Sequence, residues 1–316
     1  MSAGGDPFIS LYVLKLWKDR WYNEVDKFYI NYNNHSQVPP EVAGEFCKRV
    51  VQDPKVHLIY HPRGIGNGAP ITEMVKISQT DLVMLLEDDG FIYKPEPVSK
   101  AFGQIESDLC DVVGSPRFSC GNEVGEASAK KYGLSYDGYG DQGPNCWPNF
   151  FFCKLEDLKK TDLDFASHTW QAGEYCPKLD HTFREINHGD TFVWSCVQLR
   201  ALGLRFQNIP QYHADPYEPE NKNKKEMNWI KETPYWIHGG SLSTSWNGYL
   251  DQAPSVDTEG AKREMETRAA FWKICSDAID GFDGFKQEYQ RKLENLIDTH
   301  LDRGRVEDKI RIYSSL

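Results

Sequence analysis

Short apolar runs alternate with helix-like segments along the first hundred residues. Four of these runs predict strands, because each is short, rich in apolar or β-branched residues and bounded by turn residues: Phe8–Trp17, Lys27–Asn33, Val56–Tyr60 and Asp81–Leu86. Between them, Val42, Phe46 and Val50 recur at helical spacing after two prolines, and residues 71–77 predict a further helix. This alternation is typical of an α/β fold with a mostly parallel sheet that is flanked by helices.

The pattern becomes less regular after residue 110. Strands are predicted at residues 111–114, 149–154 and 204–209, and a helix at Thr191–Leu202, which ends at the C-cap Gly203. Residues 119–148 contain six glycines and several aromatic residues and predict a long loop, and the polar residues 214–233 predict a second loop. Residues 258–301 predict two helices that share an apolar stripe, which is typical of core packing.

Charge and composition exclude several classes of protein. The chain of 316 residues carries 36 Lys and Arg against 47 Asp and Glu, a formal net charge of −11, which argues against a nucleic-acid partner. No apolar run approaches the roughly 20 residues of a membrane helix, and no secretory signal is visible. The eight scattered cysteines form no C-x-x-C pair, so we expect reduced thiols in a cytoplasmic protein.

Three consecutive acidic residues, Glu87-Asp88-Asp89, follow the fourth predicted strand. Ligands of open α/β sheets bind at the carboxyl ends of strands, so this position is a candidate site. Adjacent carboxylates repel one another unless a cation offsets their charge, and Mg²⁺ and Mn²⁺ favour carboxylate oxygens. The triplet alone therefore predicts either a divalent-metal site that receives a nucleotide diphosphate or a solvated acidic turn.

The apolar strand followed by Glu87-Asp88-Asp89 resembles the DxD-type motif of GT-A fold, family-2-like glycosyltransferases, which use nucleotide-sugar donors. The resemblance implies a GT-A type fold and Mn²⁺ or Mg²⁺ as the cofactor. It implies that Asp89 ligates the metal and that Glu87 lies near the ribose of the donor or the waters of the metal. Asp88 takes the position that varies freely in the family, on the donor side of the site.

Two later segments resemble the same family. The segment from Gly189 to Gly203 is similar to its second acidic motif, which supplies the catalytic base of inverting members, and Asp190 is the matching carboxylate. Gly189 stands where the family usually has Glu, and Asp190 would equally serve as the N-cap of the predicted helix. His238, before two glycines, resembles the histidine that completes the metal site, with His213 and His188 as the alternatives.

These residues together imply a mechanism. The metal offsets charge on the departing diphosphate, and Asp190 takes the proton of an attacking acceptor hydroxyl, which inverts the anomeric centre. Candidates for donor binding are Asn31, Asn33 and Arg63, beside Glu87 and Asp88. Candidates for stacking on a sugar acceptor are the aromatic residues Trp147, Tyr139 and Trp246. The lysines at 222, 224 and 225 would either close over the diphosphate or form a solvated basic patch.

The chain is thus expected to be a hexosyl- or pentosyltransferase that acts on a glycan or another hydroxyl acceptor. Residues 1–250 form the expected GT-A domain, with a nucleotide-binding half at 1–110 and an acceptor half at 111–250, before a helical extension at 251–316. Oligomerisation through the helices of this extension stays open. The alternatives are a nucleotidyltransferase of related fold, a non-catalytic carbohydrate-binding protein and a glycoside hydrolase. The nucleotidyltransferase ranks below the transferase because Trp17–Arg20, taken as the segment after the first strand, lacks the expected basic, glycine-rich loop.

Overall fold

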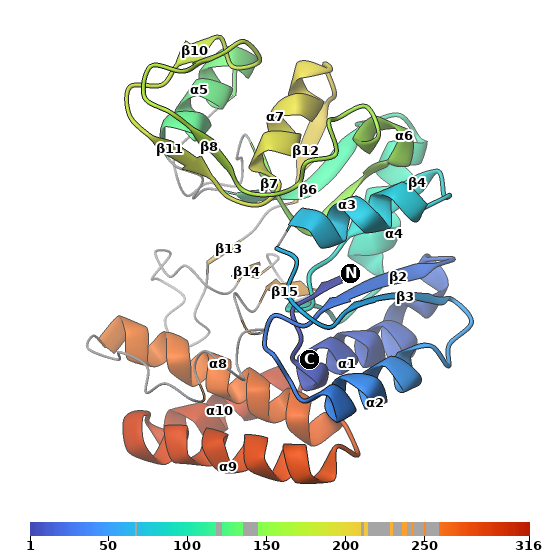
Figure 1. Ribbon diagram of the computed structural model, residues 1–316, viewed down its shortest axis with the longest axis vertical. Helices are drawn as coiled ribbons and strands as arrows, with labels where there is room; N and C mark the ends of the chain where they lie inside the picture. The colour runs from blue at the N-terminus through green and yellow to red at the C-terminus, as the bar shows by residue number, and fades with distance from the viewer. Residues whose placement is uncertain are drawn as a thin grey trace.

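The computed structural model describes residues 1–66, 68–117, 122–134, 145–209, 212–213, 228–229, 236–238, 242, 250 and 259–316. The predicted α/β class is confirmed: the described residues form two larger sheets, several two-stranded ones, covering helices and a helical layer at the end of the chain (Figure 1). The described helices do not include one that is long and apolar enough to cross a membrane.

The first sheet is wholly parallel. Its strands lie in the order β1-β2-β3 and comprise Ser2–Ala3, Phe28–Asn33 and Val56–His61. Helix α2 (Pro40–Val50) connects β2 to β3 and buries Val42, Ala43, Phe46 and Val50, so the predicted helical periodicity is confirmed.

The second sheet is mixed and has the order β12-β6-β7-β4. These strands comprise Phe206–Asn208, Val112–Arg117, Asn145–Lys154 and Leu82–Leu85. Strands β12 and β6 are parallel, and β7 runs antiparallel to both β6 and β4. A parallel bridge between Ser2 and Glu87 joins the two sheets directly after β4. The acidic triplet therefore lies where the sheets meet.

Further helices and short paired strands complete the fold. The helices are α3 (Gly68–Ile77), α4 (Glu96–Glu106), α5 (Asn122–Tyr132), α6 (Leu155–Leu158) and α7 (Val193–Ala201). The strands are β5 (Gly90–Ile92), β8 (His168–Trp170), β9 (Tyr175–Cys176), β10 (His181–Thr182), β11 (Asn187–Gly189), β13 (Tyr212–His213), β14 (Asn228–Trp229) and β15 (Trp236–His238).

The predicted strand at Phe8–Trp17 is wrong, because this segment forms helix α1 (Pro7–Leu16), followed by the short helical turns Trp17–Trp21 and Tyr22–Glu24. Asp6 caps the helix, and its side chain accepts hydrogen bonds from the main-chain N–H groups of Phe8 and Ile9 at 2.9 and 3.2 Å. Every residue of α1 except Lys15 is buried. A helix that is buried all round has no polar face, so its sequence lacks the helical period.

The prediction of a loop at residues 119–148 is also wrong in part, because this segment contains α5 and the beginning of β7. Helix α5 packs with α7 and the β8–β11 strands around a separate hydrophobic core that includes Val124, Trp170 and Val197. This helix carries few apolar residues, so its helical periodicity is weak; its sequence is Asn-Glu-Val-Gly-Glu-Ala-Ser-Ala-Lys-Lys-Tyr. Residues 118–121 and 135–144 lie outside the described residues.

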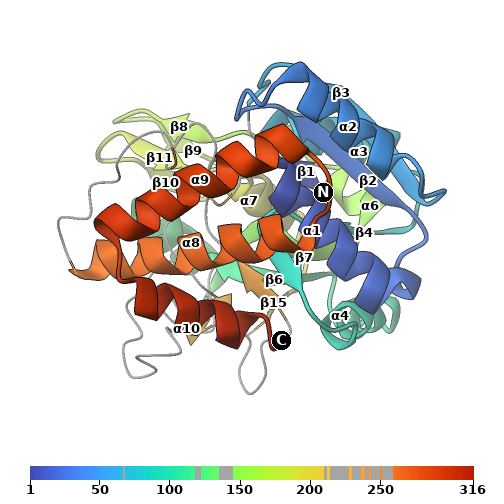
Figure 2. The same ribbon diagram turned by 90° about the horizontal axis from the view of Figure 1, so that it is seen from below.

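The end of the chain forms α8 (Glu259–Ala278), α9 (Asp283–His300) and α10 (Arg303–Tyr313). Figure 2 shows these three helices together over one face of the molecule. The two helices predicted up to residue 301 are confirmed, and α10 is an additional one. The ring of Phe8 on α1 lies 4.9 Å from that of Tyr289 on α9, so the tail shares a core with the first sheet. The division of the chain at residue 250 stays a prediction.

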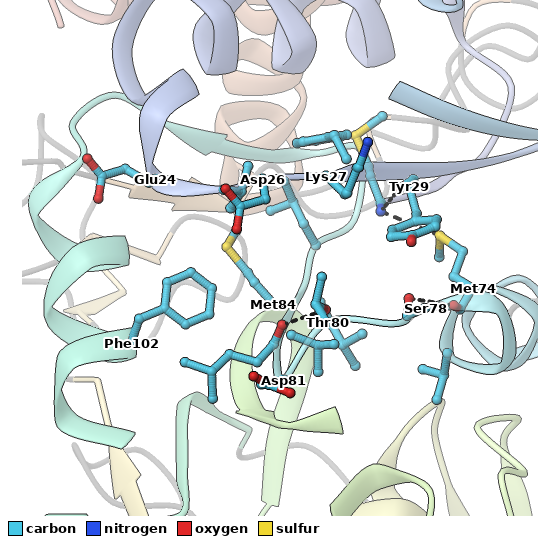
Figure 3. A pocket seen from close by; sticks show the side chains of 18 of the residues that line it. Glu24, Asp26, Lys27, Tyr29, Met74, Ser78, Thr80, Asp81, Met84 and Phe102 are labelled. Carbon is cyan, nitrogen blue, oxygen red and sulfur yellow. Dashed lines mark hydrogen bonds between the residues drawn. The ribbon is translucent and has the colours of Figure 1, made fainter. Parts of the chain in front are cut away.

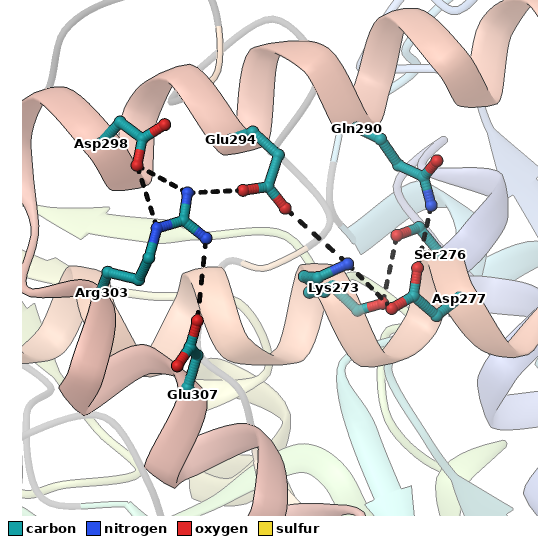
Figure 4. A network of polar contacts seen from close by, with 8 residues as sticks. All are labelled: Lys273, Ser276, Asp277, Gln290, Glu294, Asp298, Arg303 and Glu307. Atoms are coloured by element: carbon teal, nitrogen blue, oxygen red, sulfur yellow. Dashed lines mark hydrogen bonds and ion pairs between the residues drawn. The ribbon is translucent and has the colours of Figure 1, made fainter.

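Ion pairs on the outer side of the tail connect its helices (Figure 4). Arg303 contacts Glu294 and Asp298 at 2.8 and 2.6 Å, and Lys273 lies 3.0 Å from Asp277 and 3.8 Å from Glu294. These side chains are substantially exposed, so each pair contributes little to stability.

Candidate functional site

The acidic triplet forms the turn between β4 and β5. The main-chain N–H of Ser2 donates to the carbonyl of Leu86 at 2.9 Å, and that of Asp88 donates to the carbonyl of Ser2 at 3.0 Å. The turn itself closes through a hydrogen bond from the Gly90 N–H to the Glu87 carbonyl at 3.2 Å. The triplet therefore lies at the carboxyl ends of both β1 and β4, which is the position expected of a ligand site in such a sheet.

Asp88 faces the interior and connects the triplet to the first loop. Its carboxylate accepts hydrogen bonds from the Gly4 N–H at 2.7 Å and from the Ser10 hydroxyl at 3.0 Å. Burial, and the negative charges of Asp89 and Glu87, raise the pKa of Asp88 well above its ordinary value, although these hydrogen bonds lower it. These contacts hold the acidic turn to the loop after β1 and to α1. The part of Asp88 in donor binding stays a prediction.

Strand β15 brings His238 to the triplet. It pairs antiparallel with β5 so that His238 stands opposite Gly90 and Trp236 opposite Ile92. Gly90 directly follows Asp89, so the pairing sets the main chain of His238 beside the metal-ligand candidate of the triplet. Asp89 is buried and Glu87 is half-buried. The His238 side chain lies outside the described part of the structure.

Asp190 follows β11 and is exposed. The predicted N-cap role is wrong, because α7 begins at Val193 and its N-cap is Phe192, which has a φ of 72°. The Asp190 carboxylate accepts instead from the N–H of Thr191 at 2.7 Å. The ring of Phe192 packs edge-on against Phe151 with centroids 4.6 Å apart, and Phe151 stands opposite Leu85 of β4. This packing orders the Asp190 segment over the sheet next to β4, and its role as a base stays a prediction.

Asn33 holds the turn that follows β3. Its side-chain oxygen accepts from the Ile65 N–H at 2.9 Å, and its amide nitrogen donates to the Gly66 carbonyl at 3.2 Å. The same nitrogen lies 2.6 Å from His35 Nε2. Arg63 is exposed in this turn, at the same edge of the sheet as the triplet. Its side chain is accessible to an anionic ligand, whereas Asn33 is occupied in ordering the turn.

Asn31 lies inside β2 rather than at its end. Its amide donates to Glu73 of α3 at 2.7 Å, and His61 Nε2 lies 2.7 Å from the same Glu73 oxygen. These contacts attach α3 to the parallel sheet.

The remaining candidates are dispersed. Trp147 is half-buried in β7, while Tyr139, Trp246 and the lysines at 222, 224 and 225 lie outside the described residues. His188 Nδ1 lies 2.9 Å from the Thr169 hydroxyl, and His213 belongs to β13. The described side chains do not bring together three His, Cys, Asp or Glu residues that would hold a metal by themselves. The seven cysteines in the described ranges are all free thiols.

A cavity of about 540 Å³ separates β2 from β4 (Figure 3). Strand β1 is two residues long and pairs with Asn31 and Tyr32, so it fills only the carboxyl-terminal part of the space between these strands. Helices α3 and α4 contribute Met74 and Phe102 to the lining. Glu87 also lines this cavity, so the space extends from the triplet towards the amino ends of the strands.

One residue of the site was not anticipated from the sequence. Asn149 of β7 lies against Gly90, and a Cβ atom added to Gly90 would stand only 2.3 Å from the Asn149 side-chain oxygen. The available signal was an asparagine directly before the apolar run Phe150-Phe151-Phe152, where strands seldom carry a buried amide.

Comparisons with known proteins give no family. No protein-family model matches the chain, and no curated protein matches it. Among solved structures, S. aureus TarS 1–349 is similar at 10% identity and a TM-score of 0.43, over 94% of this chain and 69% of that one. A mannosyltransferase, PcManGT from Pyrobaculum calidifontis in complex with GDP-Man and Mn²⁺, is similar at 8% identity and a TM-score of 0.45, over 99% and 73%. The bifunctional IspDF from Campylobacter jejuni is similar at 11% identity and a TM-score of 0.31, over 96% and 84%. Likeness at this level carries no argument about activity, so the function is argued from the residues of this chain.

Proposed function

We propose that the protein is a glycosyltransferase that uses a divalent metal and a nucleotide-sugar donor. The observation that carries the proposal is the pairing of His238 with Gly90 at the end of the Glu87-Asp88-Asp89 turn. Two motifs that are distant in the sequence thereby meet at the carboxyl edge of the sheet. Carboxylate and imidazole groups are both ligands of divalent cations such as Mn²⁺, so the two motifs together would suit a metal site.

The donor end of the site uses residues of the first half of the chain. Asp89 and Glu87 would hold Mn²⁺ or Mg²⁺ together with His238, and a bound cation would offset the charge that develops on the departing diphosphate. Glu87 and Asp88 would border the donor. Asn33 orders the turn that carries Arg63. From this turn the guanidinium would reach the nucleotide.

The acceptor end uses residues of the second half. Asp190 is exposed. In the proposed mechanism it acts as the general base and takes the proton of the attacking acceptor hydroxyl. Direct attack with a single base inverts the anomeric centre. Trp147, Tyr139 and Trp246 would offer their rings to the apolar faces of a glycan. The proposal includes the cytoplasm as the location.

A nucleotidyltransferase is the second candidate, and one observation favours it. The first strand is β1, so the segment that follows it is Gly4-Gly5-Asp6-Pro7 and not Trp17–Arg20. This segment contains the two glycines whose absence from Trp17–Arg20 had argued against a nucleotidyltransferase. Gly4 also donates a hydrogen bond to Asp88. The first basic residue in the sequence, however, is Lys15, so the loop lacks the cation that would contact a triphosphate.

Thermal unfolding with a panel of nucleotide sugars and nucleoside triphosphates, each with and without Mn²⁺, separates the two activities. We expect a metal-dependent rise in Tm with one nucleotide sugar, and release of the matching nucleoside diphosphate when an acceptor glycan is added. Asp89→Asn should remove the metal-dependent rise, while Asp108→Asn, which changes an exposed carboxylate after α4, should retain it. Release of pyrophosphate from a triphosphate, or a rise that persists in EDTA, would overturn the proposal.

A further inference from the structure

The Asn149 side chain is fully buried and satisfies none of its hydrogen-bonding groups. Both its amide nitrogen and its amide oxygen lack a hydrogen-bond partner among the described residues. Burial deprives an amide of the water that would otherwise bind it, so an orphaned amide lowers the stability of a fold. Leucine, of similar shape, would fill the same space without this penalty.

An irregularity of β7 sets Asn149 in this position. Gly114 of β6 stands opposite Phe151 and Pro116 opposite Cys146, so that residues 147–150 of β7 face the single residue Ser115. Phe150 takes a φ of 63°, a left-handed conformation that is costly for an aromatic residue. Bulges of this kind redirect side chains and are frequent beside functional sites.

The bulge places the Asn149 side chain against Gly90, the residue that directly follows the acidic triplet. The Asn149 side-chain oxygen would lie only 2.3 Å from a Cβ added to Gly90, so a glycine is needed between this amide and the end of the triplet. Phe150 stacks on Trp236 at 5.1 Å, which fixes the bulge to β15. The main chain of β15 continues from there to His238, opposite Gly90. Asn149 and the main chain of His238 thus both lie beside Gly90, the residue that follows Asp89.

We propose that Asn149 is a further residue of the metal site, whose amide oxygen binds the divalent cation held by Asp89. The inference rests on the proposed function for the presence of that cation. Amide oxygens are ordinary ligands of hard divalent cations. Binding the cation would give the amide oxygen its missing partner, which offers a reason for a polar side chain at a fully buried position.

The test measures Mn²⁺ binding to the whole chain by electron paramagnetic resonance, without any donor, and Tm without metal. Asn149→Leu should weaken Mn²⁺ binding by about tenfold or more, a typical effect of losing a contact close to a metal. Its Tm without metal should be unchanged or higher, because the orphaned amide is gone. Ser128→Ala is the matched control, since the Ser128 hydroxyl on α5 is also buried and has no hydrogen-bond partner in the described part of the chain. It should leave Mn²⁺ binding unchanged.

Asn149→Asp keeps the shape of the side chain. If the leucine variant does not fold, this variant tests whether the side chain at position 149 binds the cation. A carboxylate at this position should bind Mn²⁺ more tightly than the amide does if this oxygen is a ligand. Equal Mn²⁺ affinity of the wild type and both variants would overturn the role of Asn149 and leave the proposed function standing. A wild-type protein that binds no Mn²⁺ would overturn the metal site in the proposed function and this inference with it.

Discussion

Asp190 is the residue on which the proposed chemistry of transfer depends. It is exposed and follows β11, and Phe192 rather than Asp190 caps α7. The Asp190 carboxylate therefore does not cap α7, and its role as the general base stays a prediction. The role requires a basic oxygen and not merely a side chain of this size.

Asp190→Asn should abolish sugar transfer while leaving the donor affinity nearly unchanged. The amide keeps the shape of the side chain and cannot take a proton from the acceptor. Initial rates and donor titration by calorimetry measure the two effects separately. Glu185→Gln, which removes another exposed carboxylate in the same region, should leave both values unchanged. Substantial turnover of the Asp190 variant would exclude this residue as the base.

A substitution at Gly90 tests how closely the residues of the candidate site are packed. A Cβ at this position would stand 2.3 Å from the Asn149 side-chain oxygen and 2.8 Å from Leu86 Cδ1, so Gly90→Ala should lower the free energy of unfolding by about 1–3 kcal/mol. Gly103→Ala is the control, because Gly103 lies in α4 and no atom is within 4 Å of its added Cβ. That change should raise stability by about 0.5–1 kcal/mol. Urea denaturation measures both, and equal effects would contradict the packing described around Asn149.

At the level of elements, one carboxylate connects α5 to the β8–β11 segment. Glu123 of α5 is buried and accepts hydrogen bonds from the main-chain N–H and the guanidinium of Arg184, both at 3.0 Å. His181 Nε2 lies 2.9 Å from the same oxygen. Burial alone would raise the pKa of Glu123, but these hydrogen bonds and the Arg184 charge outweigh it and lower the pKa to about 2.

Glu123→Gln should therefore reduce stability at neutral pH and matter less in acid. A carboxyl whose pKa falls on folding stabilises the protein above its unfolded value of about 4.5, and this contribution disappears as the pH falls from 4.5 towards 2. The difference in Tm between the wild type and this variant should shrink over that range. Glu126→Gln, an exposed neighbour on α5, should have little effect at any pH. A Tm difference that is constant from pH 7 to 3 would contradict the assignment.

At the level of the whole molecule, the tail helices are part of the main hydrophobic core. The Phe8 ring contacts those of Phe282, Phe285 and Tyr289, with centroids 4.9–5.8 Å apart. Tyr289 also donates a hydrogen bond to Asp6, the cap of α1, at 3.0 Å. Because α1 starts just after the loop that contacts Asp88, the tail supports the element on which the acidic turn rests.

Phe8→Ala should lower the free energy of unfolding by about 3–5 kcal/mol, the usual effect of deleting a buried ring. The tail and the sheets should still unfold in one urea transition, followed by far-ultraviolet circular dichroism and tryptophan fluorescence. Leu109→Ala is the control, since this side chain is 69% exposed and its loss should change stability by no more than about 0.5 kcal/mol. Two separate transitions in the wild type would show that the tail is an independent unit.

The sequence by itself determined the alternation of strands and helices, from β2 to β4, and the position of Glu87-Asp88-Asp89 at the end of a strand. Local periodicity reports which faces of a segment are buried, and turn residues report where it ends. Prediction from periodicity failed at α1 because a helix that is buried on all sides has no polar face. It failed at α5 because that helix carries few apolar residues.

Only the tertiary structure decided which distant residues meet at the site. The pairing of His238 with Gly90, the packing of Phe192 on Phe151 and the bulge that places Asn149 against Gly90 all join segments far apart in the chain. Such contacts depend on strand register and on the filling of a shared core, which no local pattern encodes. The acidic turn could thus be recognised from the sequence, but its neighbours could be known only from the fold.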